Sequence, residues 1–167
     1  MKNLFSTSIG KKFAMAISAI FLMIFLLQHF IINITSVFSE DIFNMLSHFM
    51  GTNFLVQFIL QPILIAGVLF HFIMGFYLEI QNRKAAKYEY QKEKGSANST
   101  WMSRNMITSG LVILAFLVLH FIDFWVPEMN HKYIEFLPED PNRYFKHLVH
   151  KFENPLRVAM YCLSLIH

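Results

Sequence analysis

Long apolar runs alternate with shorter polar segments along the chain. Three runs, at about residues 13–38, 55–80 and 105–126, reach the roughly 20 residues that an α-helix needs to cross a membrane. A fourth run, 155–167, ends after 13 residues. Such a helix rises only about 20 Å against a hydrocarbon core of about 30 Å, so we expect this span to continue beyond residue 167. The pattern predicts an all-α transmembrane helical bundle with four spans visible.

The composition supports a membrane protein. Hydrophobic residues make up 55% of the chain and charged residues 15%, and most charges lie outside the apolar runs. The first run is too long for a signal peptide, so we treat it as a true span. The net charge of +3 comes with no basic stripe, which gives no indication of nucleic-acid binding. The single cysteine, Cys162, excludes a disulfide or a cysteine-based metal cluster within one chain.

The distribution of Lys and Arg predicts the orientation. The N-terminal segment and the loop 81–104 are rich in Lys and Arg, whereas the segment between the first two runs has none. Cytoplasmic loops carry the excess of Lys and Arg, so the N-terminus and this loop are predicted to face the cytoplasm. Segment 42–54 is predicted to form a short interfacial helix. The loop 127–154 is expected to pack on the outer surface through its aromatic residues.

Each of the four apolar runs contains one histidine: His29, His71, His120 and His167. A single histidine in a membrane helix can serve only to bond a neighbouring helix, but one in each of four helices favours a shared function. The other four histidines are expected in loops and receive no role. They are His48, His131, His147 and His150.

The expected depths sort these four histidines into two pairs. At about 1.5 Å per residue, His29 lies about 14 Å and His120 about 8 Å inside the outer surface. His71 lies about 14 Å above the cytoplasmic surface, and His167 about 12 Å above it. The sequence therefore pairs His29 with His120 in the outer half, and His71 with His167 in the inner half.

Two neutral imidazoles from facing helices, one on each side of an iron, are the ligands of a six-coordinate b-type haem. A zinc or copper site needs three or four ligands at one depth. A proton relay is the main rival, but it usually recruits Asp or Glu. The only acidic residues in the predicted spans are Glu79 and Asp123, both near span ends.

Three stretches resemble a known family, the cytochrome b subunit of succinate:quinone oxidoreductases of the two-haem, single-anchor b558 type. They are "SIGKKFAMAISAIFLMIFLLQHFIINI", with a His-x3-Asn at His29 and Asn33, "LFHFIMGFYLEIQNRKAA" around His71, and "STWMSRNMITSGLVILAFLVLHFIDFW" around His120. The resemblance covers nearly the whole chain. It implies five spans, of which four are visible here.

The resemblance also implies roles for single residues. His29 and His120 would ligate the haem farther from the soluble subunits, and His71 with a fourth-helix histidine the nearer one. That last ligand is either His167 or a residue about one turn beyond it. Arg104 would pair with a haem propionate, unless it is an ordinary positive-inside anchor. Trp101 and Trp125 are expected to mark the membrane interfaces.

By this resemblance the chain anchors a flavoprotein subunit and an iron–sulfur subunit on the cytoplasmic face of a bacterial inner membrane. It would carry electrons between them and menaquinone through two b haems, in succinate dehydrogenase or fumarate reductase. Asp123 is a candidate for the protons that quinone turnover requires. The sequence has no Gly-rich nucleotide motif, so flavin and dicarboxylate would bind elsewhere. The alternatives are a dihaem subunit of a hydrogenase or formate dehydrogenase, and a non-haem helical membrane protein.

Overall fold

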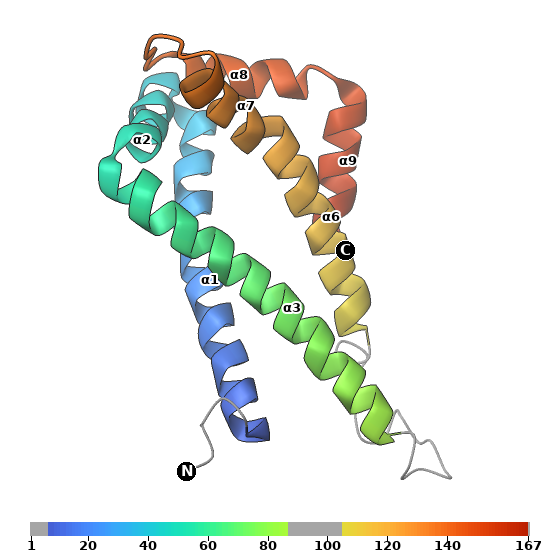
Figure 1. The fold of residues 1–167 in the computed structure, drawn as a ribbon. Helices are drawn as coiled ribbons and strands as arrows, with labels where there is room; N and C mark the ends of the chain where they lie inside the picture. Colours follow the sequence, from blue (N-terminus) through green and yellow to red (C-terminus); the bar gives the residue numbers. More distant parts are fainter. Residues whose placement is uncertain (1–6, 87–104, 167) are drawn as a thin grey trace. The chain divides into compact units, whose positions relative to one another are not determined.

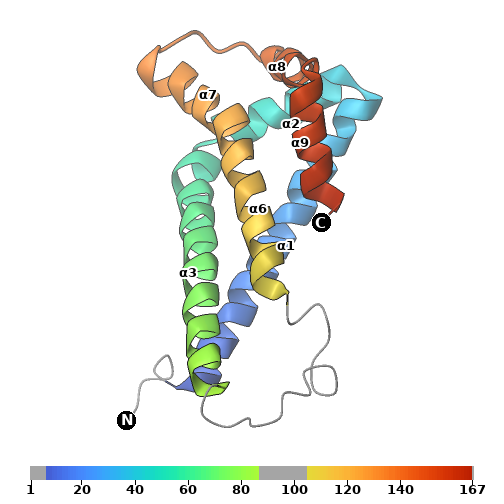
Figure 2. The same ribbon diagram turned by 90° about the vertical axis from the view of Figure 1, so that its right-hand side faces the viewer.

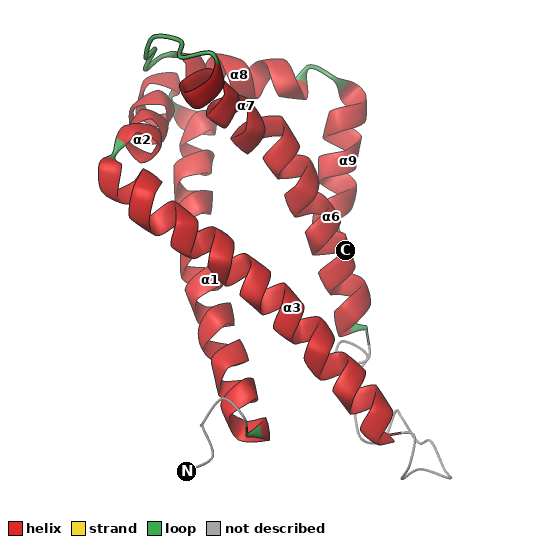
Figure 3. Cartoon of the chain, in the orientation of Figure 1, coloured by secondary structure: helices red, strands yellow, loops and turns green. Residues whose placement is uncertain are grey.

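The computed structural model describes residues 7–86 and 105–166, and within these ranges it contains helices and short connections but no strand (Figure 3). The chain divides into two compact units, residues 1–91 and 92–167, and each is described by itself. The first contains α1 (Ser8–Phe38), α2 (Glu40–Thr52), the π-helical turn η2 (Val56–Leu60) and α3 (Gln61–Ala86) (Figure 1). The second contains α6 (Met106–His120), η3 (Phe121–Trp125), α7 (Val126–Met129), η4 (Asn130–Ile134), α8 (Arg143–Phe152) and α9 (Pro155–Ile166).

Three helical stretches are long and apolar enough to cross a membrane: Ser8–Phe38, Val56–Lys84 and Met106–Ile134. The three long helices of the sequence prediction are therefore confirmed, and their length and composition fit membrane spans. In the apolar window of each, at most 6% of the residues are buried within the protein. Most of the outward-facing side chains on these helices are Leu, Ile, Phe and Val. A surface of this kind fits lipid and not water. The helical bundle and its membrane character are thus supported, while a fourth and a fifth span stay predictions.

In the first unit, α1 and α3 pack as an antiparallel pair. Phe21, Ser18 and Met15 on α1 face Gly67, His71 and Gly75 on α3 in reverse order. The three α3 positions are four residues apart and therefore share one face of the helix. A Cβ added at Gly67 would lie 3.0 Å from the Phe21 ring, so the absence of a side chain there lets the two helices approach closely.

The helix α2 crosses the end of the pair where α1 finishes and α3 begins (Figure 2). Ser39 ends α1 and also caps α2, because its hydroxyl oxygen accepts a hydrogen bond from the amide of Ile42 at 3.3 Å. Glu40 and Asp41 follow in the first turn, where acidic side chains complement the helix dipole. The helix predicted at 42–54 is therefore confirmed as α2, which this cap starts two residues earlier and which ends at Thr52. Its place at the membrane interface stays a prediction.

Two of the π-helical turns lie just before a proline. The turn η2 precedes Pro62, and η3 precedes Pro127. A proline has no N–H, so the carbonyl four residues before it loses its helical donor. In the turn before Pro62 the bonding shifts to the fifth residue, as the amide of Gln61 shows by donating to the carbonyl of Val56. The long spans continue through these positions without breaking.

In the second unit, the span that begins at Met106 continues to Ile134, eight residues past the predicted end at 126. Just past this end, Phe136 has a left-handed φ of 50°, and the Leu137 amide donates back to the His131 carbonyl at 3.1 Å. The expectation of a loop over 127–154 was therefore wrong. Its first part extends the span, and α8 is a further helix whose polar face is formed by Arg143, Lys146, His147, His150 and Lys151.

Candidate functional site

His71 lies in the contact between α1 and α3. Its Nδ1 is 2.9 Å from the hydroxyl oxygen of Ser18. Ser18 is 8% exposed, and its hydroxyl also donates to the carbonyl of Met15 at 2.8 Å. The edge of the Phe72 ring lies against the imidazole, with centroids 6.5 Å apart. The His71 ring thus bonds Ser18 through Nδ1 and also contacts Phe72.

His29 lies on α1, in the same unit as His71 but at a different level. Eleven residues separate it from Ser18, which is about 16 Å along the helix axis. Its ring stacks on Phe25, with centroids 5.5 Å apart and planes at 22°. One metal ion cannot reach two imidazoles that far apart, since metal–nitrogen bonds are about 2 Å long. His29 and His71 therefore cannot ligate the same metal ion, which agrees with the different depths expected from the sequence.

His120 is the last residue of α6 and lies between two phenylalanines of its own helix. It stacks on Phe116 at 5.9 Å between centroids and contacts Phe124 at 5.2 Å. Its environment resembles that of His29: an imidazole on an apolar helix, stacked on the Phe one turn earlier. The similar setting fits equivalent roles for the two rings.

The remaining predicted site residues, His167 and Arg104, lie outside the described residues. Each predicted pair takes one histidine from each unit, so the pairing of His29 with His120 and of His71 with His167 stays a prediction. Within the described ranges, no group of three or more His, Cys, Asp or Glu side chains could hold a metal ion. A bis-histidine haem needs only two ligands, and the apolar aromatic surroundings of His29, His71 and His120 fit a macrocycle of that kind.

Asp123 is the centre of a buried ion cluster that was not predicted from the sequence. Its carboxylate is 1% exposed. One carboxylate oxygen lies 3.3 Å from the guanidinium of Arg157 and accepts a hydrogen bond from the hydroxyl of Tyr161 at 3.2 Å. The other oxygen lies 3.8 Å from the ammonium of Lys151. A buried carboxylate needs such partners, and they join the third span to α8 and α9.

His147 also contacts this cluster, and the expectation that it lies in a loop without a role was wrong. It is a residue of α8, and its Nε2 lies 3.1 Å from the backbone carbonyl of Asp123. A carbonyl can only accept, so the ring nitrogen donates. In a regular α-helix this carbonyl would bond the amide of residue 127, which is Pro127 and has no N–H. His147 supplies a donor at this position.

The other three histidines expected in loops also lie in helices: His48 in α2, His131 in η4 and His150 in α8. They form no common site. The Nδ1 of His150 bonds the carboxylate of Glu153 at 3.2 Å on the exposed surface. His48 lies in the helix predicted at 42–54. The helical setting of His131 and His150 was missed because the segments around them are short and polar, without the length of a span.

A second ion group fixes the start of α8. Glu128 pairs with Lys132 at 2.7 Å and with the guanidinium of Arg143. That guanidinium also lies over the ring of Tyr144, 4.5 Å from its centroid. Burial, with the nearby Glu128 carboxylate, raises the pKa of the Tyr144 phenol above its ordinary value. Tyr144 therefore stays neutral. Because Arg143 pairs with Glu128 and Lys151 lies near Asp123, ion pairs join both ends of α8 to the third span.

Comparisons with known proteins add no relative: no protein-family model matches the chain, and neither does any curated protein or solved structure. The membrane character rests on the three long apolar helices. Any function has to be argued from the side chains that these helices carry.

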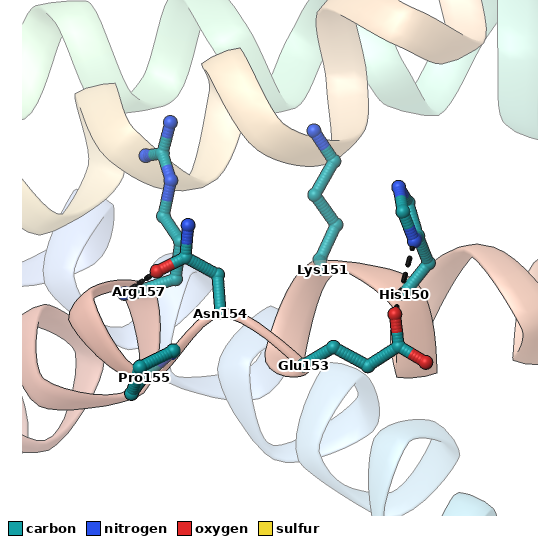
Figure 4. A pocket seen from close by; sticks show the side chains of 6 residues that line it. All are labelled: His150, Lys151, Glu153, Asn154, Pro155 and Arg157. Carbon is teal, nitrogen blue, oxygen red and sulfur yellow. Dashed lines mark hydrogen bonds and ion pairs between the residues drawn. The ribbon is translucent and has the colours of Figure 1, made fainter.

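A pocket of about 500 Å³ lies where α8 meets α9 (Figure 4). It is lined by His150, Lys151, Glu153, Asn154, Pro155 and Arg157. Its two strong cations, Lys151 and Arg157, already face the carboxylate of Asp123, and Glu153 adds a further negative charge. The charge of the pocket is therefore balanced, and we assign it no ligand.

Proposed function

We propose that this chain is the membrane anchor and dihaem cytochrome b subunit of a succinate:quinone oxidoreductase. The observation that carries the proposal is the separation of His29 from His71 by about 16 Å within one unit, each in an apolar helix. Two ligand levels on one pair of helices fit two haems placed one above the other. The resemblance of the three quoted stretches to the b558 family supplies the identity of the enzyme.

When bound, the two haems supply one-electron transfer across the hydrophobic core. The residues of the chain provide the setting for this. His29, His71 and His120 would each hold a haem through a ring nitrogen, and the stacked Phe25 and Phe116 orient two of these rings. The fourth ligand would be a histidine of the fourth apolar run, for which His167 is the candidate in this sequence.

The proposal extends to the partners and the membrane. A flavoprotein subunit and an iron–sulfur subunit bind on the cytoplasmic face of a bacterial inner membrane, where the N-terminus and the loop 81–104 lie. Menaquinone exchanges electrons with the anchor from within the bilayer. Arg104, which lies outside the described residues, would pair with a haem propionate. Lys151 and Arg157 compensate the negative charge of the buried Asp123 carboxylate. We therefore assign Asp123 a structural role and no proton transfer.

A reduced-minus-oxidised optical spectrum of the purified protein tests the haem content. We expect an α band typical of b-type cytochromes, with two components that separate in a redox titration. The substitution His71→Ala should remove one component, and His29→Ala or His120→Ala the other. His150→Ala is the matched control, because this exposed histidine bonds only Glu153 and should leave both components intact.

The outcomes separate the proposal from its rivals. A protein with no α band would be a non-haem membrane protein, and the proposal would be wrong. Two haems without succinate-dependent quinone reduction, in the complex purified with its soluble subunits, would favour the cytochrome of a hydrogenase or formate dehydrogenase. Loss of that activity in His29→Ala or His120→Ala, together with the loss of one haem, supports the proposal.

A further inference from the structure

We infer that Ser18 is a positioning residue for His71: it fixes the imidazole in the tautomer that carries its proton on Nδ1 and thereby tunes the metal centre that His71 ligates. The inference deepens the proposed function and rests on it for the metal. It starts from two hydrogen bonds made by one hydroxyl group, to Met15 and to His71.

A count of hydrogens decides the direction of each bond. The hydroxyl of Ser18 has one hydrogen, and the carbonyl of Met15, 2.8 Å away, can only accept it. The contact of 2.9 Å with Nδ1 of His71 is then a hydrogen bond only if the ring donates and the serine oxygen accepts. Both bonds form together only when Nδ1 carries the proton. This tautomer leaves the lone pair on Nε2, the nitrogen available to a metal ion.

The position of Ser18 supports the tautomer with the proton on Nδ1 of His71. It is a buried residue on the face of α1 that contacts α3, and its bond to Met15 holds the hydroxyl toward its own helix. The neighbouring contacts, Phe21 with Gly67 and Met15 with Gly75, keep the two helices close on both sides of the His71 ring. The hydrogen bond between Ser18 and His71 is therefore part of the packed contact between α1 and α3.

A hydrogen bond from the second ring nitrogen makes an imidazole a stronger donor to the metal. A stronger donor stabilises the oxidised iron more than the reduced iron. Ser18 therefore lowers the reduction potential of the haem that His71 ligates. The other haem, on His29, receives nothing from this serine, because it lies about 16 Å farther along α1.

The substitution Ser18→Ala removes the acceptor, and Ser18→Thr keeps a hydroxyl that bonds the preceding turn in the same way. In a spectroelectrochemical titration of the full complex, we expect Ser18→Ala to favour reduction of the His71-dependent haem about three-fold. That corresponds to about 30 mV upward at 59 mV per tenfold for one electron. Ser18→Thr should stay near the wild-type value. Ser36→Ala is the control on the same helix, since the Ser36 hydroxyl bonds only the carbonyl of Asn33 in its own turn.

A second measurement reads the tautomer without any haem. In protein prepared without haem and labelled with ¹⁵N-histidine, so that no metal fixes the tautomer, the His71 signals, identified by their loss in His71→Asn, should show a protonated Nδ1. They should lose this pattern in Ser18→Ala and keep it in Ser18→Thr. A protonated Nε2 in the wild type overturns the inference, whether or not the protein binds haem.

The possible outcomes distinguish a failure of the role of Ser18 from a failure of the proposed function. Two haems with an unchanged potential in Ser18→Ala overturn the role of Ser18 and leave the proposed function standing. Loss of only the His71-dependent haem in Ser18→Ala, with its retention in Ser18→Thr, supports the role. Its loss in both variants counts against a role of the hydroxyl. Absence of all haem in the wild type overturns the proposed function, and the ¹⁵N measurement then decides the tautomer alone.

Discussion

The carboxylate of Asp123 lies 3.3 Å from the guanidinium of Arg157, which joins the third span to the helix that follows α8. Asp123 is 1% exposed, whereas the side chain of Arg157 is 34% exposed. Tyr161, one turn further along α9, donates to the same carboxylate oxygen and packs its ring against Phe116 at 5.6 Å between centroids. One carboxylate thus determines how α9 returns beside α6.

We expect Arg157→Met to lower the free energy of unfolding in detergent by about 2–4 kcal/mol, since removing one partner leaves a buried charge. The lower part of that range applies because Lys151 remains 3.8 Å from Asp123. The double variant Asp123→Asn with Arg157→Met should recover most of the loss. The measurement is chemical denaturation followed by circular dichroism.

The control is Arg83→Met. Arg83 lies only 2.7 Å from Glu79, but its side chain is 70% exposed. Exposed pairs contribute little, so we expect no measurable change. If Arg83→Met and Arg157→Met lowered stability equally, burial of the carboxylate would not be the cause.

His147 and Pro127 should be energetically coupled. His147→Ala removes the donor to the carbonyl of Asp123, and we expect a loss of about 1–2 kcal/mol in the free energy of unfolding. Pro127→Ala restores a backbone N–H that can bond this carbonyl instead. In the Pro127→Ala background, the substitution His147→Ala should therefore cost much less. A double-mutant cycle measures this coupling; equal costs in the two backgrounds would contradict it.

The spans could be predicted from the sequence because their signal is length and hydropathy, which depend on local composition. Ser8–Phe38 and Val56–Lys84 agree with the predicted runs to within a few residues. The third span was predicted too short because Pro127 and the charges after it looked like a loop. The helix instead continues through Pro127 after a π turn, and Glu128 forms an ion pair with Lys132 one turn later.

The contacts of single side chains could not be predicted in the same way. The pairing of Ser18 with His71 depends on the rotation of both helices about their axes, which hydropathy alone does not fix. For Asp123 a signal did exist. Arg157, two residues into the fourth run, and Asp123, near the outer end of the third, occupy similar depths in adjacent antiparallel segments. Opposite charges at one depth in an apolar setting should pair.

The glycines offer a graded test of helix contact. At Gly67 an added Cβ would lie 3.0 Å from the Phe21 ring, at Gly75 it would lie 3.8 Å from the Met15 methyl, and at Gly110 it would meet nothing within 4 Å. Alanine gains about 1 kcal/mol over glycine in a helix, and overpacking costs about 1–3 kcal/mol. We expect stability to rise in Gly110→Ala, to rise or stay level in Gly75→Ala, and to fall in Gly67→Ala.

Thermal unfolding of the three variants in one detergent measures this order. Because all three substitutions are the same, differences in side-chain chemistry cancel. A stabilised Gly67→Ala would show that the Phe21 ring moves aside at no cost, and that the contact between α1 and α3 does not depend on glycine.

The orientation of the chain can be tested with single cysteines in a Cys162→Ser background. Glu139 lies in the exposed segment between η4 and α8, and Lys84 is exposed near the end of α3. Because cytoplasmic segments carry the excess of Lys and Arg, we place Lys84 inside and Glu139 outside. A membrane-impermeant maleimide applied to intact cells should label Glu139→Cys strongly and Lys84→Cys only after permeabilisation. The reverse pattern would contradict this orientation and, with it, the proposed binding of soluble subunits on the cytoplasmic face.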